Sequence, residues 1–88
     1  MDWRIEFSPA ASREIRKLDR ELQRRVLAYL EALTTDCDNP RQRGKGLTSQ
    51  RSGLWRYRVG DLRVICKIQD HELIVLVVNV SHRSSAYG

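Results

Sequence analysis

The C-terminal third of the chain constrains the fold most, because it contains three strand-like runs joined by very short turns. The runs cover residues 54–59, 62–69 and 72–81, and the turns between them are Gly60-Asp61 and Asp70-His71. Turns this short connect neighbouring antiparallel strands, so the pattern predicts a three-stranded meander. The last run contains LIVLVVNV, which is apolar at both parities and is therefore expected at the centre of the sheet.

The N-terminal part of the chain predicts one more strand and two helices. Residues 3–7, WRIEF, alternate apolar and charged side chains with the period of a strand. Ser8-Pro9 is typical of a helix start and opens a helix that is expected to end near Leu18. A second helix is expected from Asp19, because the apolar residues after it form one stripe. These residues are Leu22, Val26, Tyr29, Leu30 and Leu33. The charges on the helix pair form either a solvated face or a partner-binding surface.

Residues 34–53 show no period and contain turn formers throughout, which predicts a long loop anchored by Leu47. An 88-residue chain is long enough for one modest core, so residues 1–88 are expected to form a single domain. The predicted fold class is α+β. It comprises an N-terminal strand and a helical hairpin packed on a mainly antiparallel four-stranded sheet, in the order β-α-α-β-β-β, with a short C-terminal turn or helix.

The positive charge of the chain is concentrated in one segment. Residues 41–63 hold seven basic residues and one acidic residue, a net charge of +6, whereas the whole chain carries +5. Such a local excess predicts a polyanionic partner, with nucleic acid as the first candidate and an acidic protein as the second.

Three arginines of this segment are expected on one face of the meander. If Gly60-Asp61 forms a two-residue turn, Arg58 lies directly opposite Arg63, and Arg56 lies on the same face one pair further along. Like charges opposite each other destabilise a sheet, so the pattern favours a face built to hold an anion. Arginine suits phosphate because its planar fork binds two oxygens at once. A solvent-exposed strand face is the alternative, and these three residues alone leave it open.

The remaining candidate residues lie at the C-terminus, where His82, Arg83 and Tyr87 follow the last strand. Their spacing does not match a zinc or magnesium site, so no metal or cofactor is expected. Cys37 and Cys66 are interpreted as reduced structural thiols. The chain has no apolar run long enough for a membrane span and its start does not resemble a signal peptide, so we expect a cytoplasmic protein without membrane contact.

Across its whole length the chain resembles the RelE/ParE superfamily of bacterial type II toxin–antitoxin systems. WRYRVGDLRVICKI, residues 55–68, looks like the RelE pattern of alternating basic residues, a turn and a further arginine. VSHRSSAY, residues 80–87, is similar to the VGHR motif of the family followed by a tyrosine. The resemblance implies a ribosome-dependent endoribonuclease. Such toxins cut messenger RNA in the A site by attack of the 2′-hydroxyl, without metal, and so inhibit translation.

The resemblance also implies roles for particular residues. The catalytic set would be Arg56, Arg58, Arg63, Arg83 and Tyr87. Many relatives carry lysine in place of the Arg56–Arg58 pair, which shifts the role of general base to Tyr87 or His82. Further RNA contacts would come from Arg41, Arg43, Lys45 and Arg51.

The implied partners are a cognate acidic, RelB-like antitoxin, the 70S ribosome with its mRNA, and operator DNA only through the toxin–antitoxin complex. Two alternatives remain open. One is a ParE-like inhibitor of DNA gyrase, and the other is a non-catalytic module that binds RNA or antitoxin.

Overall fold

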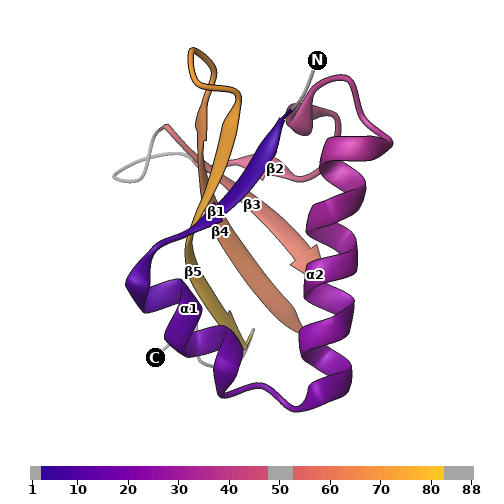
Figure 1. Ribbon diagram of the computed structural model, residues 1–88, viewed down its shortest axis with the longest axis vertical. Helices are drawn as coiled ribbons and strands as arrows, with labels where there is room; N and C mark the ends of the chain where they lie inside the picture. The colour runs from indigo at the N-terminus through magenta and orange to yellow at the C-terminus, as the bar shows by residue number, and fades with distance from the viewer. Residues whose placement is uncertain (1–2, 48–52, 83–88) are drawn as a thin grey trace.

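Two helices cover one face of a five-stranded sheet in the computed structural model, which describes residues 3–47 and 53–82 (Figure 1). The helices are α1 (Pro9–Arg16) and α2 (Arg20–Thr35). The strand order is β1-β5-β4-β3-β2, with β1 parallel to β5 and every other pair antiparallel. The strands are β1 (Arg4–Phe7), β2 (Lys45–Gly46), β3 (Leu54–Val59), β4 (Leu62–Gln69) and β5 (Ile74–His82). The predicted α+β class is confirmed, but the sheet has five strands and not four.

Both predicted helix starts are confirmed, and each has a side-chain cap. The Ser8 hydroxyl accepts the backbone N–H of Ala11 at 3.1 Å, and the Asp19 carboxylate accepts that of Leu22 at 2.9 Å. These caps satisfy N–H groups that have no partner inside the helix. The first helix ends at Arg16, two residues before the expected end. The amide of Gln23 donates to the carbonyl of Leu18 at 3.1 Å and so stabilises the turn between the helices.

The predicted loop over residues 34–53 is partly wrong, because the end of the second helix and two short elements occupy its described part. The second helix continues to Thr35, Pro40–Gln42 form a 3₁₀ helix, and Lys45–Gly46 pair with β3 as a fifth strand. The 3₁₀ helix has a local signal, because Asn39 and Gln42 form a capping box around Pro40. The pairing of Lys45–Gly46 depends on β3, which lies further along the chain, so composition alone could not reveal this strand.

Three contacts hold this segment against the sheet. The Tyr57 hydroxyl donates to the Pro40 carbonyl at 2.8 Å, and Nε1 of Trp55 donates to the Arg43 carbonyl at 2.6 Å. The guanidinium of Arg41 donates two hydrogen bonds to the carboxylate of Asp70, at 2.8 and 2.9 Å. The loop is therefore anchored mainly by the aromatic residues of β3, whereas the expected anchor Leu47 is half-buried.

The predicted bounds of the last strand also need correction. The turn before β5 extends over residues 70–73, and Leu73 adopts a left-handed backbone with φ of 55°, so β5 begins at Ile74 and not at residue 72. The strand lies inside the sheet as predicted, between β1 and β4, although β4 occupies the middle position. The expected C-terminal turn or helix lies outside the described residues.

A β-bulge in β5 explains why valines of both parities along this strand face the core. Ile65 pairs with Asn79 whereas Cys66 pairs with Val77, so Val78 is an extra residue that shifts the register by one. Before the bulge, the odd-numbered Val77 faces the helices, and after it the even-numbered Val80 does so and is 4% exposed. The bulge thereby keeps valines in the core along the whole strand and moves the intervening polar residues to the opposite face.

The core lies between the helices and the sheet and contains Tyr57 and Cys66, both fully buried. Burial raises the pKa of the Tyr57 hydroxyl and raises the pKa of the Cys66 thiol to about 12. Both groups are therefore neutral at physiological pH, and Cys66 and Cys37 are free thiols. Among the described helices, none has the length and apolar character needed to cross a membrane.

We predict that Tyr57→Phe lowers the free energy of unfolding by about 1 to 2 kcal/mol, because the buried Pro40 carbonyl loses its donor. Urea denaturation followed by circular dichroism measures the change. Tyr29→Phe is the matched control: the Tyr29 hydroxyl has no hydrogen bond to a described residue, so we expect its stability to stay within about 0.5 kcal/mol of the parent. Equal stability of the two variants would show that the Tyr57 bond does not hold the loop.

Candidate functional site

The β3–β4 hairpin has the predicted register. Arg58 pairs with Arg63, and Val59 pairs with Leu62, on either side of the turn at Gly60, whose φ is 59°. Side chains alternate along a strand, so the arginines lie on the face away from the helices while Val59 and Leu62 enter the core. The sheet has one apolar face and one face that carries arginines.

The arginine side chains lie in a positive environment. Arg58 is exposed, and Arg56 and Arg63 are half-buried. Within the described parts of the chain, no carboxylate lies within ion-pair distance of Arg56 or Arg58. The charges of Arg56 and Arg58 are therefore not offset by an acidic residue of the described parts, which favours binding of an anion.

The neighbouring strands place further polar residues on this face. Lys45 of β2 pairs with Arg56, and Ser81 of β5 pairs with Arg63. Asn79 pairs with Ile65 on the same face, but its amide donates to the Glu14 carboxylate at 2.9 Å. Lys45 and Ser81 thus extend the arginine face across the sheet, and sequence reasoning missed Ser81 because its position depends on the bulge.

Glu14 of α1 protects the part of β5 that β1 leaves uncovered. The backbone N–H of Val80 donates to its carboxylate at 2.7 Å, at a point of the strand beyond the end of β1 at Phe7. Edge N–H groups of a sheet otherwise remain open to other chains. Glu14 acts as a structural residue, and it is not among the charges that face solvent.

The C-terminal candidates divide into one described residue and two that are not described. His82 pairs with Leu62, which places it on the helix-facing side of the sheet and not beside Arg63. Arg83 and Tyr87 lie outside the described residues, as does Arg51 of the loop. The bulge decides the side on which His82 lies, and the sequence pattern carried no sign of it.

Two basic residues of the loop have structural partners. Arg41 pairs with Asp70, and its hydrogen bonds lower the pKa of that carboxyl. The guanidinium of Arg41 also lies 6.0 Å from the ring centroid of Trp55. Arg43 lies 5.6 Å from the ring centroid of Tyr29. Both arginines remain exposed, so their predicted contact with RNA would add to these structural roles.

The outer edge of β3 borders a hollow of about 320 Å³. It is lined by Tyr29, Gly44, Lys45, Arg56 and Arg58. Sequence reasoning assigned Tyr29 to the apolar stripe of its helix, and its ring does pack against Tyr57 with centroids 5.8 Å apart. The structure adds that Tyr29 also borders a basic hollow, which the helical period alone could not reveal.

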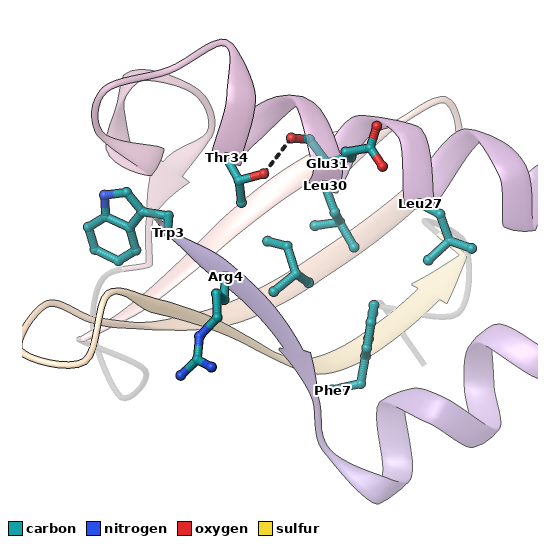
Figure 2. Close-up of a pocket in the computed structure, with 8 residues that line it drawn as sticks. Trp3, Arg4, Phe7, Leu27, Leu30, Glu31 and Thr34 are labelled. Atoms are coloured by element: carbon teal, nitrogen blue, oxygen red, sulfur yellow. Dashed lines mark hydrogen bonds between the residues drawn. The ribbon is translucent and has the colours of Figure 1, made fainter. Parts of the chain in front are cut away.

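A larger hollow of about 570 Å³ lies between β1 and α2, away from the arginine face (Figure 2). Phe7 of the strand and Leu27 and Leu30 of the helix point toward it, whereas Arg4 points away (Figure 2). Leu27 is 46% exposed and is the large apolar side chain that the described structure leaves most open. The lining is mainly apolar, which is typical of a surface that docks another chain.

In the described ranges, no group of three His, Cys, Asp or Glu residues is placed to hold a metal ion. The guanidinium groups of the arginine face can stabilise negative charge on a bound anion.

Comparison with known proteins agrees with this geometry. A family model described as ParE toxin of type II toxin-antitoxin system, parDE, matches residues 5–87. The chain belongs to this toxin family, which is part of the RelE/ParE superfamily indicated by its motifs. Toxin RelG of Mycobacterium tuberculosis is 26% identical over 87 residues, which cover 99% of this chain and 98% of that protein.

Solved structures show the same fold. The RelBE2 toxin–antitoxin complex of Mycobacterium tuberculosis matches with a TM-score of 0.83 and 25% identity, over 94% of this chain and 100% of that one. The archaeal RelE–RelB complex of Pyrococcus horikoshii gives 0.71 and 20%, over 94% and 97%. A free mutant form of E. coli toxin RelE gives 0.78 and 18%, over 99% and 90%.

We predict that Arg58→Gln raises the free energy of unfolding by about 0.5 kcal/mol at low salt, because it relieves the repulsion of the directly opposed Arg63. Urea denaturation at about 0.02 M and about 1 M NaCl measures the effect. The gain should disappear at high salt, because about 1 M NaCl screens the repulsion between charges that are more than a few ångströms apart. Arg24→Gln on the exposed face of α2 is the control for loss of a charge. A gain of equal size in this control would mean that net charge, and not the opposed pair, sets the effect.

Proposed function

We propose that this toxin is an endoribonuclease that cleaves mRNA in the ribosomal A site. The observation that carries the proposal is the pair of opposed arginines, Arg58 and Arg63, with Arg56 beside them on an open sheet face. Directly opposed like charges cost a sheet stability, and a function that uses both charges would explain why the pair is present. The similarity to RelE toxins supports the proposal, and the cytoplasm, where ribosomes translate messages, is the expected compartment.

The arginines suit cleavage that uses the 2′-hydroxyl of the RNA as nucleophile. In this reaction a bond forms between the 2′-oxygen and phosphorus while the bond to the 5′-oxygen breaks, which leaves a 2′,3′-cyclic phosphate and a 5′-hydroxyl. Negative charge increases on the non-bridging oxygens in the transition state. Arg58 and Arg63 would stabilise this charge, each by about 3 to 4 kcal/mol if placed as well as a good oxyanion donor. Arg56 and Arg83 would hold the phosphate in place.

Proton transfer requires a group other than arginine, whose pKa exceeds about 12. His82 and Tyr87 are the two candidates, and the position of His82 on the helix-facing side of the sheet favours Tyr87. Nearby guanidinium groups would lower the pKa of Tyr87 below its usual value of about 10 and so favour the phenolate. Tyr87 would remove the proton of the 2′-hydroxyl, and the 5′-oxygen would take a proton from water as it leaves.

The basic residues around the catalytic arginines would bind the message and the ribosome. Arg43, Lys45 and Arg51 are the candidates for contacts to the RNA backbone, with Arg41 contributing from its ion pair with Asp70. Such contacts depend steeply on salt, because each one releases counterions from the RNA.

The cognate partner would be an acidic, RelB-like antitoxin. Relatives have been solved as complexes with antitoxins, among them RelBE2 of Mycobacterium tuberculosis and RelE–RelB of Pyrococcus horikoshii. The apolar hollow between β1 and α2 suits an amphipathic segment of such a partner, since Leu27 is left open there. Operator DNA would be contacted only through the toxin–antitoxin complex.

A second function, inhibition of DNA gyrase, has one observation in its favour. The matching family model is described as a ParE toxin, and the sequence is also compatible with a ParE-like inhibitor of DNA gyrase. A gyrase inhibitor would arrest growth while messages stay intact. Mapping new 5′ ends on translated messages after induction in growing cells separates the two functions.

We predict that induction produces cuts within reading frames at a fixed offset in the codon, and that Arg63→Ala and Tyr87→Phe each lower cleavage at least about 100-fold. The same variants should keep antitoxin binding. Arg63→Lys tests whether the fork of arginine is needed, and Arg24→Gln is the control for loss of charge. Full cleavage by both Arg63→Ala and Tyr87→Phe would contradict the assigned site. Growth arrest without any cuts would favour gyrase.

We predict that Leu27→Asp weakens antitoxin binding at least about tenfold while mRNA cleavage stays unchanged, because the substitution places a charge in the apolar hollow. Calorimetric titration of the toxin with its antitoxin measures the affinity. Glu31→Gln, at the rim of the same hollow, is the control for a change that leaves the apolar surface intact. Normal affinity of Leu27→Asp would show that the antitoxin docks elsewhere.

A further inference from the structure

The basic hollow at the outer edge of β3 is not explained by the catalytic arginines alone. We propose that it binds the RNA phosphate next to the scissile one and that Tyr29 of α2 is a positioning residue in it. This inference rests on the proposed function for the identity of the scissile phosphate, whereas the binding of an RNA or DNA phosphate in the hollow can be tested without it.

The ring of Tyr29 is held from two directions. It packs against Tyr57 with centroids 5.8 Å apart and an angle of 60° between the rings, and Arg43 lies 5.6 Å from its centroid. Tyr57 is in turn fixed by its hydrogen bond to Pro40. A ring held in this way presents its hydroxyl at a defined position, which reduces the entropy lost when a ligand binds.

The hydroxyl of Tyr29 is available to a ligand. It has no hydrogen bond to any described residue, and no buried polar atom in the described parts lacks a partner, so this hydroxyl is reached by solvent. Burial raises the pKa of Tyr29, and nearby Arg43 opposes this only in part. The group is therefore protonated at neutral pH and can donate a hydrogen bond to a phosphate oxygen.

The charges that line the hollow all have the same sign. Lys45, Arg56 and Arg58 border it together with Tyr29, and no acidic residue among residues 3–47 and 53–82 does. Gly44 completes the lining. It has a φ of 77°, and a Cβ at this position would lie 2.3 Å from the Arg56 carbonyl oxygen, so no larger residue fits without a shift of the backbone. The chain is thus pressed against β3 at a point that leaves space beside three cations.

Arg56 and Arg58 also border a second, much smaller hollow on the side of the hairpin turn. It measures about 10 Å³ and is also lined by Arg63 and Asp61, whereas the hollow at Tyr29 measures about 320 Å³. The small hollow is too narrow to enclose a phosphate and offers contact only through the side chains at its rim. The hollow at Tyr29 has room for a phosphate with part of its sugar. Two anion contacts that share Arg56 and Arg58 match two successive phosphates of one RNA strand.

The first test measures binding separately from cleavage. A fluorescent, single-stranded 2′-deoxy oligonucleotide cannot be cut by 2′-attack, and its affinity is read by fluorescence anisotropy. We expect Tyr29→Phe to bind about fivefold more weakly and Lys45→Gln about tenfold more weakly than the parent, with non-additive effects in the double variant because both residues contact one phosphate. Lys45→Gln should also lower the slope of log affinity against log salt by about 0.7, the value for one phosphate of a single strand.

Arg24→Gln is the matched control. It removes a charge from α2, the helix that carries Tyr29, and Arg24 lines a different hollow that shares no lining residue with the basic hollow. Parental affinity of Tyr29→Phe, or a loss for Lys45→Gln no larger than that of the control, would overturn the proposal. Reduced antitoxin affinity in both variants, with unchanged oligonucleotide affinity, would also overturn it and would assign the hollow to the antitoxin.

The second test locates the phosphate relative to the cleaved bond. Ribosome-bound synthetic messages carry one 2′-hydroxyl in the A-site codon and one uncharged methylphosphonate at a neighbouring position. We expect the methylphosphonate at the adjacent phosphate to lower the cleavage rate of the parent about tenfold. In the double variant Tyr29→Phe and Lys45→Gln, the same methylphosphonate should cause no further loss of rate. If the parent binds oligonucleotides as expected but cleaves no message, the proposed function fails and the phosphate site stands. Equal sensitivity of parent and variant to the methylphosphonate would overturn the adjacent position.

Discussion

The pairing of β3 with β4 is the interaction on which the rest of the structure depends. Arg58 faces Arg63 and Val59 faces Leu62 across the turn. Because side chains alternate along a strand, a slip of one residue would exchange the two faces, burying the arginines and exposing the core residues. Burial of Tyr57 and Leu62 opposes such a slip, since each would lose its place in the core. The apolar face therefore supplies the stability that the opposed charges reduce.

Tyr57 links this hairpin to the other parts of the molecule. Its ring lies in the core beside Tyr29, and its hydroxyl holds the Pro40 carbonyl of the loop. The loop then places Gly44 and Lys45 against the edge of β3, where Lys45 pairs with Arg56. One buried aromatic residue thus connects the core, the second helix and the basic hollow, and the edge of the sheet becomes part of the candidate site.

The two hollows separate two tasks on the molecule. The apolar hollow lies between β1 and α2, and the basic hollow lies at the opposite edge of the sheet, beside β2 and β3. A partner could occupy the first without displacing an anion from the second. A toxin that has to meet both an antitoxin and an RNA would be served by this arrangement, because each surface can be altered separately.

The sequence by itself determined where the two helices start and the register of the β3–β4 hairpin. Ser8 and Asp19 mark the helix starts through their caps, and the two-residue turn at Gly60 sets which strand residues pair, because these signals are local in the chain. Only the tertiary structure decided the fifth strand, the side on which His82 lies and the second role of Tyr29. Lys45 becomes a strand residue only when β3 is beside it, and the bulge at Val78 changes the side of every later residue of β5. These features depend on contacts between distant segments, and no local pattern of residues encodes them.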